Sequence, residues 1–205
     1  MITRIYRYVL MYDRGMAPNP RGGLVTLATC KPQIRRHARA GDWVMGNFPS
    51  PTNELVAWAG KIARCIPVGE YPKEFPDRED ALYETGSDGR TRRIEGKLPW
   101  YHRGEDQQRR DCSGNVLMFD MASCWYFGSD GREIPQDLEH LIARGIGHRV
   151  NGRRPGDLER LQQWLNEQAP PGVHGGPRDG WDGPNNGGCG PGNRPKPNGN
   201  SDKSC

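Results

Sequence analysis

The stretch that decides the fold is residues 54–66, which read ELVAWAGKIARCI. Val56, Trp58 and Ile62 fall on one side of an extended chain and small alanines on the other, which is the two-residue period of a β-strand. Gly60 interrupts this strand and indicates a bulge or a close backbone contact. A long strand of this kind needs partners, so we expect a sheet around it.

The neighbouring segments supply such partners. Strand patterns occur both before and after residues 54–66, at residues 4–11, 24–28, 43–46, 115–120 and 124–128. A tight connection is expected between the last two of these strands. Helical spacing, with proline at or near the start, occurs at residues 32–41, 135–144 and 155–168. This order lacks the regular strand–helix alternation of a doubly wound fold. The sequence therefore predicts an α+β fold with a small mixed or largely antiparallel sheet and helices at its edge.

Composition divides the chain into a folding part and a tail. Apolar residues make up 34% of the 205 residues, and the shortfall is concentrated in residues 170–205, where 10 glycines and 7 prolines occur among 36 positions. A segment of this kind buries too little apolar surface to offset the entropy of ordering. We expect one domain over residues 1–169, with a polar insert at 67–112, and a disordered tail over 170–205. Long inserts are often functional.

Several classes of protein are excluded by the sequence pattern. No run approaches the ~18 apolar residues of a membrane span, and residues 1–15 resemble a strand more than a signal peptide. The six cysteines form no CxxC pair, which predicts reduced thiols in the cytoplasm. Glycine-rich nucleotide loops, HExxH and GxSxG are absent, and we expect no metal or cofactor. The formal net charge of +4 permits an anionic partner without requiring one.

A basic segment covers the predicted helix that begins at residue 32. It contains Lys31, Arg35, Arg36, His37 and Arg39 and has no acidic residue. Guanidinium groups bind phosphate in a bidentate manner, so this face suits nucleic acid. An ordinary solvated helix face explains the same pattern equally well.

Polar and aromatic residues around this helix offer further contacts. Asp13 and Asn19 lie in a Pro/Gly-rich loop, where turn formation is the simpler explanation and recognition of base edges the more specific one. Asp42 is expected to close a turn. Trp43 and Trp100 are candidates for stacking on a base, although Trp43 has an equal claim to the core.

The histidines assign no mechanism by their spacing. His102 lies in the insert next to Trp100 and Tyr101, and His148 lies between two predicted helices. Histidine suits proton transfer near neutral pH, but an isolated histidine is more often structural. Cys112, Cys124 and His102 make only a weak candidate zinc set.

Residues 8–46 carry a resemblance to a known family. The motif DRGMAPNP at residues 13–20, TLATCKPQIR at 26–35 and GDW at 41–43 resemble the nucleotide modification associated domain 2 family. SCWYFG at residues 123–128, Ile134-Pro135 and Gly147-His148-Arg149 are similar to its C-terminal part. Together these motifs cover roughly residues 1–150. The resemblance implies a link to systems that make or handle modified bases in DNA, often in phages and in bacterial defence.

A weaker similarity connects the helix, the Gly-Asp-x-Val strand and the following strand to PUA-like domains of the EVE type. That similarity implies a partly open barrel that accepts a flipped, modified base. The loop at residues 13–20 and the insert at 67–112 depart from the PUA-like pattern.

Three functions therefore remain open. In the first, the domain binds a modified nucleobase or nucleotide in DNA or RNA, and its contacts are Asp13, Asn19, Lys31, Arg35, Arg36, Arg39, Asp42 and Trp43 or Trp100. In the second, it is a small enzyme of base modification that uses Asp13, Cys30, Lys31 or His148. In the third, it is a protein-interaction module with no role in nucleic-acid binding. The partner expected from the first two is a nucleic acid or nucleotide and not a membrane.

Overall fold

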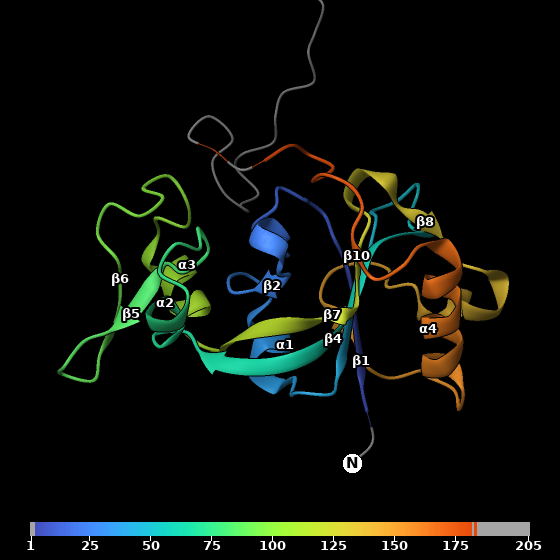
Figure 1. Cartoon of the computed structure of the whole chain (residues 1–205), viewed down its shortest axis with the longest axis horizontal. Helices are drawn as coiled ribbons and strands as arrows, with labels where there is room; N and C mark the ends of the chain where they lie inside the picture. The colour runs from blue at the N-terminus through green and yellow to red at the C-terminus, as the bar shows by residue number, and fades with distance from the viewer. Residues whose placement is uncertain (1–2, 182, 184–205) are drawn as a thin grey trace, which may run out of the picture.

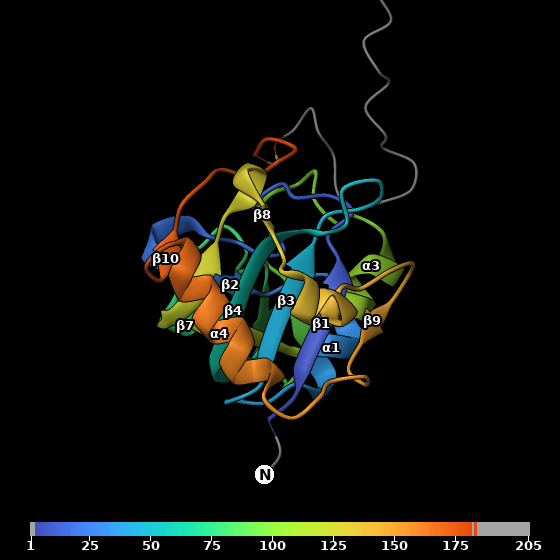
Figure 2. The same ribbon diagram turned by 90° about the vertical axis from the view of Figure 1, so that its right-hand side faces the viewer.

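The computed structural model describes residues 3–181 and 183. Its centre is one open, curled sheet with the strand order β10-β7-β4-β3-β1-β9, to which β2 adds along β7 and β8 along β4 (Figures 1 and 2). The strands of this sheet are β1 (Ile5–Val9), β2 (Thr26–Leu27), β3 (Trp43–Asn47), β4 (Leu55–Pro67), β7 (Asn115–Tyr126), β8 (Arg132–Glu133), β9 (His148–Arg149) and β10 (Gly172–Val173). The helices are α1 (Pro32–His37), α2 (Tyr71–Glu74), α3 (Glu105–Asp111) and α4 (Asp157–Gln168), with 3-10 turns η1 (Arg21–Gly23), η2 (Gly128–Asp130) and η3 (Gln136–Leu141).

The predicted α+β class and mixed sheet are confirmed. β4 pairs with β3 and β7 in antiparallel fashion, whereas β1 runs parallel to β3 and β10 parallel to β7. The register of β4 against β7 shifts directly after Gly60. A Cβ at Gly60 would lie 2.8 Å from the Cys124 sulfur, so the close contact expected at this glycine is also present.

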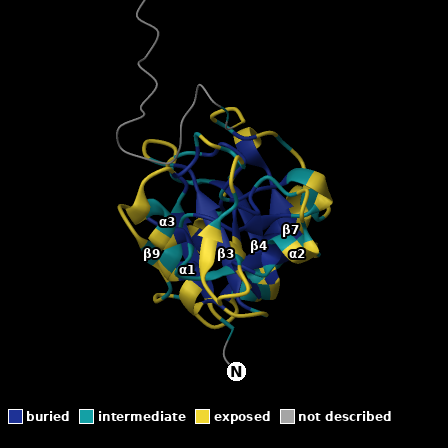
Figure 3. Cartoon of the chain, turned by 90° about the vertical axis from the view of Figure 1, so that its left-hand side faces the viewer, coloured by how far each residue is buried: buried dark blue, intermediate teal, exposed yellow. Residues whose placement is uncertain are grey.

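Each face of the sheet buries its own apolar cluster. On one face, Tyr8, Val25 and Trp58 pack with Ile34 from α1. On the other face, Trp43 and Trp125 pack with Trp164 from α4, which lies across this side of the sheet (Figure 2). Figure 3 shows that buried residues gather along the strands, while exposed residues gather on the surrounding helices and loops. Successive residues of each strand thus point to opposite faces of the sheet and supply apolar side chains to both, and a helix covers each face.

The insert at residues 67–112 folds against one end of the sheet. It contains α2, α3 and a hairpin of β5 (Tyr83–Thr85) and β6 (Thr91–Arg93), which project from the sheet on the side opposite α4 (Figure 1). Tyr71, Tyr83 and Tyr101 are buried there against Val116 and Met118 of β7. The insert is polar overall but has its own core, which holds its loops against the turn that precedes α1.

Some predicted elements differ from the observed ones. Residues 115–120 and 124–128 were expected to form two strands, but Asn115–Tyr126 is one strand, because it follows the long strand β4 along almost its whole length. Residues 136–141 form the 3-10 turn η3 in place of a longer helix. His148 begins the short strand β9, which pairs with β1.

The boundary expected at residue 169 also differs from the structure. β10 pairs with β7, the Asp179 N–H donates to the Asp13 carbonyl at 2.9 Å, and Arg178 donates to the Met11 carbonyl at 2.8 Å. Residues 170–181 therefore pack on the domain through backbone pairing and through side chains such as Trp181, whose ring lies against the Arg21 guanidinium. The remainder of the predicted disordered tail, residue 182 and residues 184–205, lies outside the described residues.

Within the described part of the chain, no helix has the length and apolar character that crossing a membrane requires.

Candidate functional site

The turn between β2 and α1 has an unusual backbone. Cys30 and Lys31 both have a positive φ, 55° and 39°, although neither is glycine. Left-handed conformations cost such residues free energy and cluster at functional sites, where surrounding contacts hold them in place. Pro32 follows as the first residue of α1. The turn presents Cys30 to the insert, where its N–H donates to the Asp111 carboxylate at 2.9 Å.

Cys30, His102 and Asp111 form a chain of contacts. The Cys30 Sγ lies 3.6 Å from His102 Nε2, and His102 Nδ1 lies 2.5 Å from Asp111 Oδ2. A nucleophile, a base and a group that orients the base occur in this order in enzymes that activate a thiol or a hydroxyl. A proton on His102 Nδ1 donates to Asp111 and leaves Nε2 to face the thiol. The arrangement is therefore that of a Cys-His-Asp triad.

Asp111 is buried and held by three further groups. The Tyr83 hydroxyl donates to Oδ2 at 3.0 Å, the Cys30 N–H donates to Oδ1, and the Arg35 guanidinium lies 3.9 Å from Oδ1. Only 1% of Asp111 is exposed. Donors and a cation around a buried carboxylate satisfy its oxygens and hold it in a fixed position. These contacts fix the end of the triad that lies farthest from the thiol.

His102 is held by backbone and ring contacts. Its φ is 46°, and its ring stacks on Tyr101 with a centroid distance of 4.0 Å. Burial by itself lowers the pKa of His102, but hydrogen bonds to Asp111 and Cys30 outweigh it and raise the pKa to about 9. The Tyr101 hydroxyl lies 3.7 Å from the Cys30 Sγ and 2.8 Å from the Thr29 hydroxyl. A protonated imidazole thus lies next to the thiol at neutral pH.

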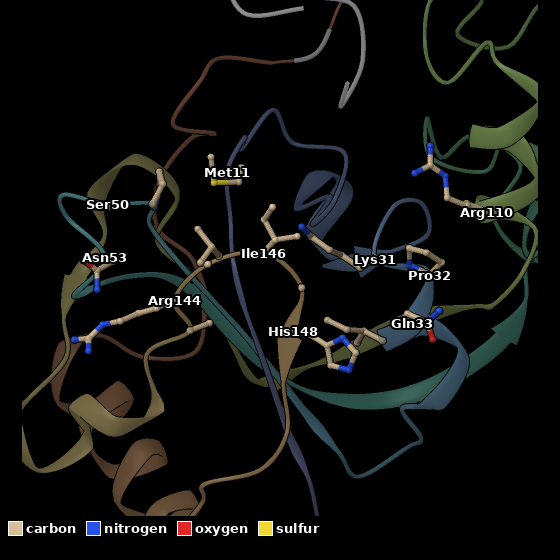
Figure 4. Close-up of a pocket in the computed structure, with 16 residues that line it drawn as sticks. Met11, Lys31, Pro32, Gln33, Ser50, Asn53, Arg110, Arg144, Ile146 and His148 are labelled. Atoms are coloured by element: carbon tan, nitrogen blue, oxygen red, sulfur yellow. The ribbon is translucent and has the colours of Figure 1, made fainter. Parts of the chain in front are cut away.

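Two cavities meet at this triad. The smaller, about 120 Å³, is lined by Cys30, His102, Asp111 and Gln107 together with Lys31, Pro32 and Arg110. The larger, about 840 Å³, shares these last three residues (Figure 4). Its described lining also includes Arg144 and His148 and contains no acidic side chain. The thiol therefore lies beside a basic cavity large enough for a small organic anion.

The model of one family matches this chain. Nucleotide modification associated domain 2 matches residues 2–83 and 101–182. The chain belongs to this family. The two matched segments contain Cys30, His102 and Asp111, as well as Tyr83 and Tyr101, so every triad residue lies within the family domain, including those that the insert contributes. No curated protein and no solved structure matches, and the similarity to PUA-like domains stays a prediction.

The structure brings some of the predicted site residues to the triad and leaves others away from it. Cys30 faces His102, and Lys31 lines both cavities, with its Nζ 4.3 Å from the centre of the Tyr8 ring. His148 lines the larger cavity from β9, and its pKa is lowered by burial and by the neighbouring charges of His37 and Arg149. Cys30, Lys31 and His148 thus share one region.

Asp13 and Asn19 serve a different region. Both oxygens of Asp13 accept from the Tyr126 hydroxyl, at 2.9 and 2.8 Å, and burial raises the pKa of Asp13. The Asn19 Oδ1 accepts from the Arg21 N–H, while the Asn19 backbone bridges to Thr26. Neither residue lines the cavities at Cys30. The Asn19 side chain thus closes a turn, whereas the Asp13 carboxylate bonds to β7, 113 residues away, and closes no local turn.

Arg35 corrects the prediction of a basic helix face. Its side chain is fully buried and donates to the carbonyls of Asn115 at 2.9 Å and Asp111 at 2.6 Å, so it cannot reach a phosphate. Gly114 permits this burial, because a Cβ there would lie 2.9 Å from the Arg35 Cβ. Arg36 and Arg39 are exposed and remain available to an anion.

Asp42, Trp43 and Trp100 take structural positions. Asp42 accepts from the N–H groups of Arg4 and Arg39 and closes the turn before β3. Trp43 is stacked on Trp125 inside the core with 2% exposure, so the buried ring offers no face to a base. Trp100 is half-buried against the core of the insert.

Sequence reasoning missed the role of His102 and did not consider Asp111. His102 and Asp111 are nine residues apart, and both lie more than 70 residues from Cys30, so no local motif joins them. The expectation that the insert has a function was the one signal that pointed toward them. Among the described residues, no group of His, Cys, Asp and Glu side chains forms a metal site.

Proposed function

We propose that this protein is a cysteine-dependent enzyme that acts on a nucleotide or nucleobase in a nucleotide modification system. The chain of contacts from the Cys30 Sγ through His102 to Asp111 carries this proposal. The family description supports the class of substrate. A merely structural cysteine needs neither a buried histidine–carboxylate pair nor a cavity beside it.

The roles follow from the geometry. The proton of the Cys30 thiol resides on His102 Nε2, so that a thiolate lies beside an imidazolium, and the thiolate sulfur forms a bond to an electrophilic carbon of the substrate. The electron pair displaced from that carbon moves to the oxygen or nitrogen bonded to it. The imidazolium then returns the proton to the leaving group or to the adduct, while Asp111 keeps the ring oriented and stabilises its charge.

The reactivity of Cys30 tests this proposal without a known substrate. An ordinary thiol is only about 1% thiolate at pH 6.5, whereas a thiol paired with imidazolium reacts well below its usual pKa. Labelling with iodoacetamide between pH 5 and 9 is followed for each cysteine by peptide mass spectrometry. We expect Cys30 to react at least ~10-fold faster than Cys65 at pH 6.5.

Cys65 and Cys112 are internal controls for that experiment. Both are half-buried, and burial raises the pKa of each thiol. If Cys30 follows the same pH profile as Cys65 and Cys112, the enzyme proposal fails. A reactive thiol also requires a reducing compartment, which supports the cytoplasmic location that we expect from the cysteine pattern.

A second candidate function is the binding of a modified base without catalysis. The larger cavity and the exposed Arg36 and Arg39 favour it. If the protein only binds modified bases, it should bind DNA oligonucleotides with modified bases more tightly than unmodified ones, and Cys30→Ser should leave this affinity unchanged. An affinity that falls steeply with salt indicates contacts with the phosphates.

A further inference from the structure

The larger cavity has an apolar floor. β1 and the segment that follows it contribute Val9 and Met11, and α1 contributes Ile34. Pro49 and Ala143 complete the apolar part of the lining. Such a surface suits a flat organic ring, because apolar walls bind the faces of a ring without specific hydrogen bonds.

Cations lie on the side of this cavity that faces the triad. Lys31 and Arg110 line both cavities, so a ligand that fills the larger one and extends toward Cys30 meets both. Arg110 is exposed, and its Nε donates to the Asp106 carbonyl, which holds the side chain on α3. His148 also lines this cavity, and the exposed Arg149 follows it on β9. The charge that this rim attracts is negative.

Arg144 contributes less to this field. Its guanidinium donates to the Glu139 carboxylate at 3.0 Å, and in Figure 4 it extends toward Asn53, on the side away from Arg110. Arg144 is therefore paired with an acidic residue at the far end of the cavity, whereas Lys31 and Arg110 place their positive charges on the side next to the thiol.

A short loop brings an isoleucine over the cavity. Ile146 lines it with a fully exposed side chain, and it lies between Gly145 and Gly147, whose φ values are 76° and 91°. Arg149 holds the loop by donating to the carbonyls of Arg144 at 2.9 Å and Ile146 at 3.3 Å. Lys31 and Ile146 reach into the cavity from opposite sides (Figure 4). A bound ring would cover the exposed side chain of Ile146.

We infer that the larger cavity binds a nucleoside monophosphate unit, with its base between the apolar floor and Ile146 and its phosphate held by Lys31 and Arg110. This inference rests on the proposed function and names the substrate class of the same site. The phosphate then lies on the thiol side, next to the smaller cavity that Cys30 lines. Arg110 is then the residue that distinguishes nucleotides from nucleosides.

Protection of Cys30 from iodoacetamide tests the inference. The probes are the four deoxynucleoside monophosphates, the matching deoxynucleosides and inorganic phosphate. We expect at least one monophosphate to slow labelling of Cys30, its nucleoside to require an at least ~10-fold higher concentration, and phosphate alone to protect weakly. Calorimetry with the same probes gives the dissociation constants independently.

Two neighbouring arginines provide a matched comparison. Arg110→Glu reverses a charge that lines both cavities, whereas Arg109→Glu makes the same change one residue earlier on α3, at an exposed residue paired with Asp106. We expect Arg110→Glu to weaken monophosphate binding at least ~10-fold and Arg109→Glu by less than about 2-fold. Ile146→Ala should weaken it by about 5-fold, and Val173→Ala, at another exposed apolar residue, should not.

The outcomes separate the two proposals. A fast-reacting Cys30 that no monophosphate protects overturns the nucleotide inference and leaves the enzyme proposal standing. Equal protection by nucleoside and nucleotide, or equal effects of the two arginine variants, also overturns the inference. Protection of an ordinarily reactive Cys30 supports the cavity and removes the enzyme.

Discussion

Two polar loops of this domain look alike in sequence and differ in what they do. The loop around Asp13 and the turn around Cys30 both follow a strand and both bear candidate site residues. Asp13 is 1% exposed, and its carboxylate is engaged by Tyr126. Cys30 is half-buried and lines a cavity that it shares with His102.

The two loops differ in the groups to which their buried carboxylates are connected by hydrogen bonds. Asp13 accepts from Tyr126, and its backbone pairs with Asp179, so its contacts close a loop on the domain. Asp111 is equally buried, but its contacts continue through His102 to a sulfur at a cavity. A buried carboxylate indicates a functional site when its chain of hydrogen bonds ends at a reactive group that a ligand can reach.

The largest expected effect is at Cys30. Cys30→Ser removes the fast-reacting thiol in iodoacetamide labelling and lowers any turnover by at least ~10³-fold, because the remaining residues of a triad act only through the nucleophile. Since the residue keeps nearly the same size, the thermal midpoint should stay within about 2 °C. A persistent fast-reacting thiol in this variant would assign the reactivity to another cysteine.

Asp111→Asn should affect both the site and the fold. The buried Arg35 loses the charge 3.9 Å away, so the free energy of unfolding should fall by about 4 kcal/mol in urea titrations. His102 loses its charged partner, so Cys30 labelling at pH 6.5 should slow by at least ~10-fold. An unchanged labelling profile in a stably folded variant contradicts the triad.

The pH dependence of stability should report His102. Its pKa rises from 6.5 to about 9 on folding, so its contribution is complete below pH 6.5 and is lost as the pH rises through 9. The free energy of unfolding should therefore decrease by up to about 3 kcal/mol over this window. His102→Gln should remove this dependence in denaturant titrations, whereas His148→Gln should retain it, since folding lowers the pKa of His148.

The smallest effect is expected at Asp13. Burial raises its pKa above 3.8, so the stability linked to its neutral form is lost as the pH rises from 3.8 through the folded value. At pH 7 Asp13→Asn should change the free energy of unfolding by less than about 1 kcal/mol in either direction, because the amide oxygen still accepts from Tyr126. Slower Cys30 labelling in this variant, as in Asp111→Asn, would remove the contrast between the two loops.

The sheet and α4 could be predicted because their signals are local. The alternation around Trp58 and the spacing of Leu158, Leu161 and Leu165 report burial directly along the chain. The continuous strand β7 was missed because long-range pairing decided it: hydrogen bonding to β4 continues β7 through the turn that was expected there. β10 was missed for the same reason, since its hydrogen bonds to β7 involve the backbone alone.

Local pattern was also sufficient for part of the site. The motif around Cys30 and Lys31 marked a segment typical of its family, and the model of that family matches the segment. Arg35 belongs to the same motif, but the sequence alone did not show that it points inward. Its position depends on Gly114, which is 79 residues away and leaves room for the Cβ and the backbone of Arg35.

The sequence by itself indicated the strands β1 to β4, the helix α4, the family and the cysteine that lies at the site, because each depends on residues close together in the chain. Only the tertiary structure brought His102 and Asp111 to that cysteine. The insert buries Tyr71, Tyr83 and Tyr101 against β7, and this packing holds Asp111 of α3 within reach of the Cys30 turn. A triad assembled across more than 70 residues depends on packing, and packing has no local signature in the chain.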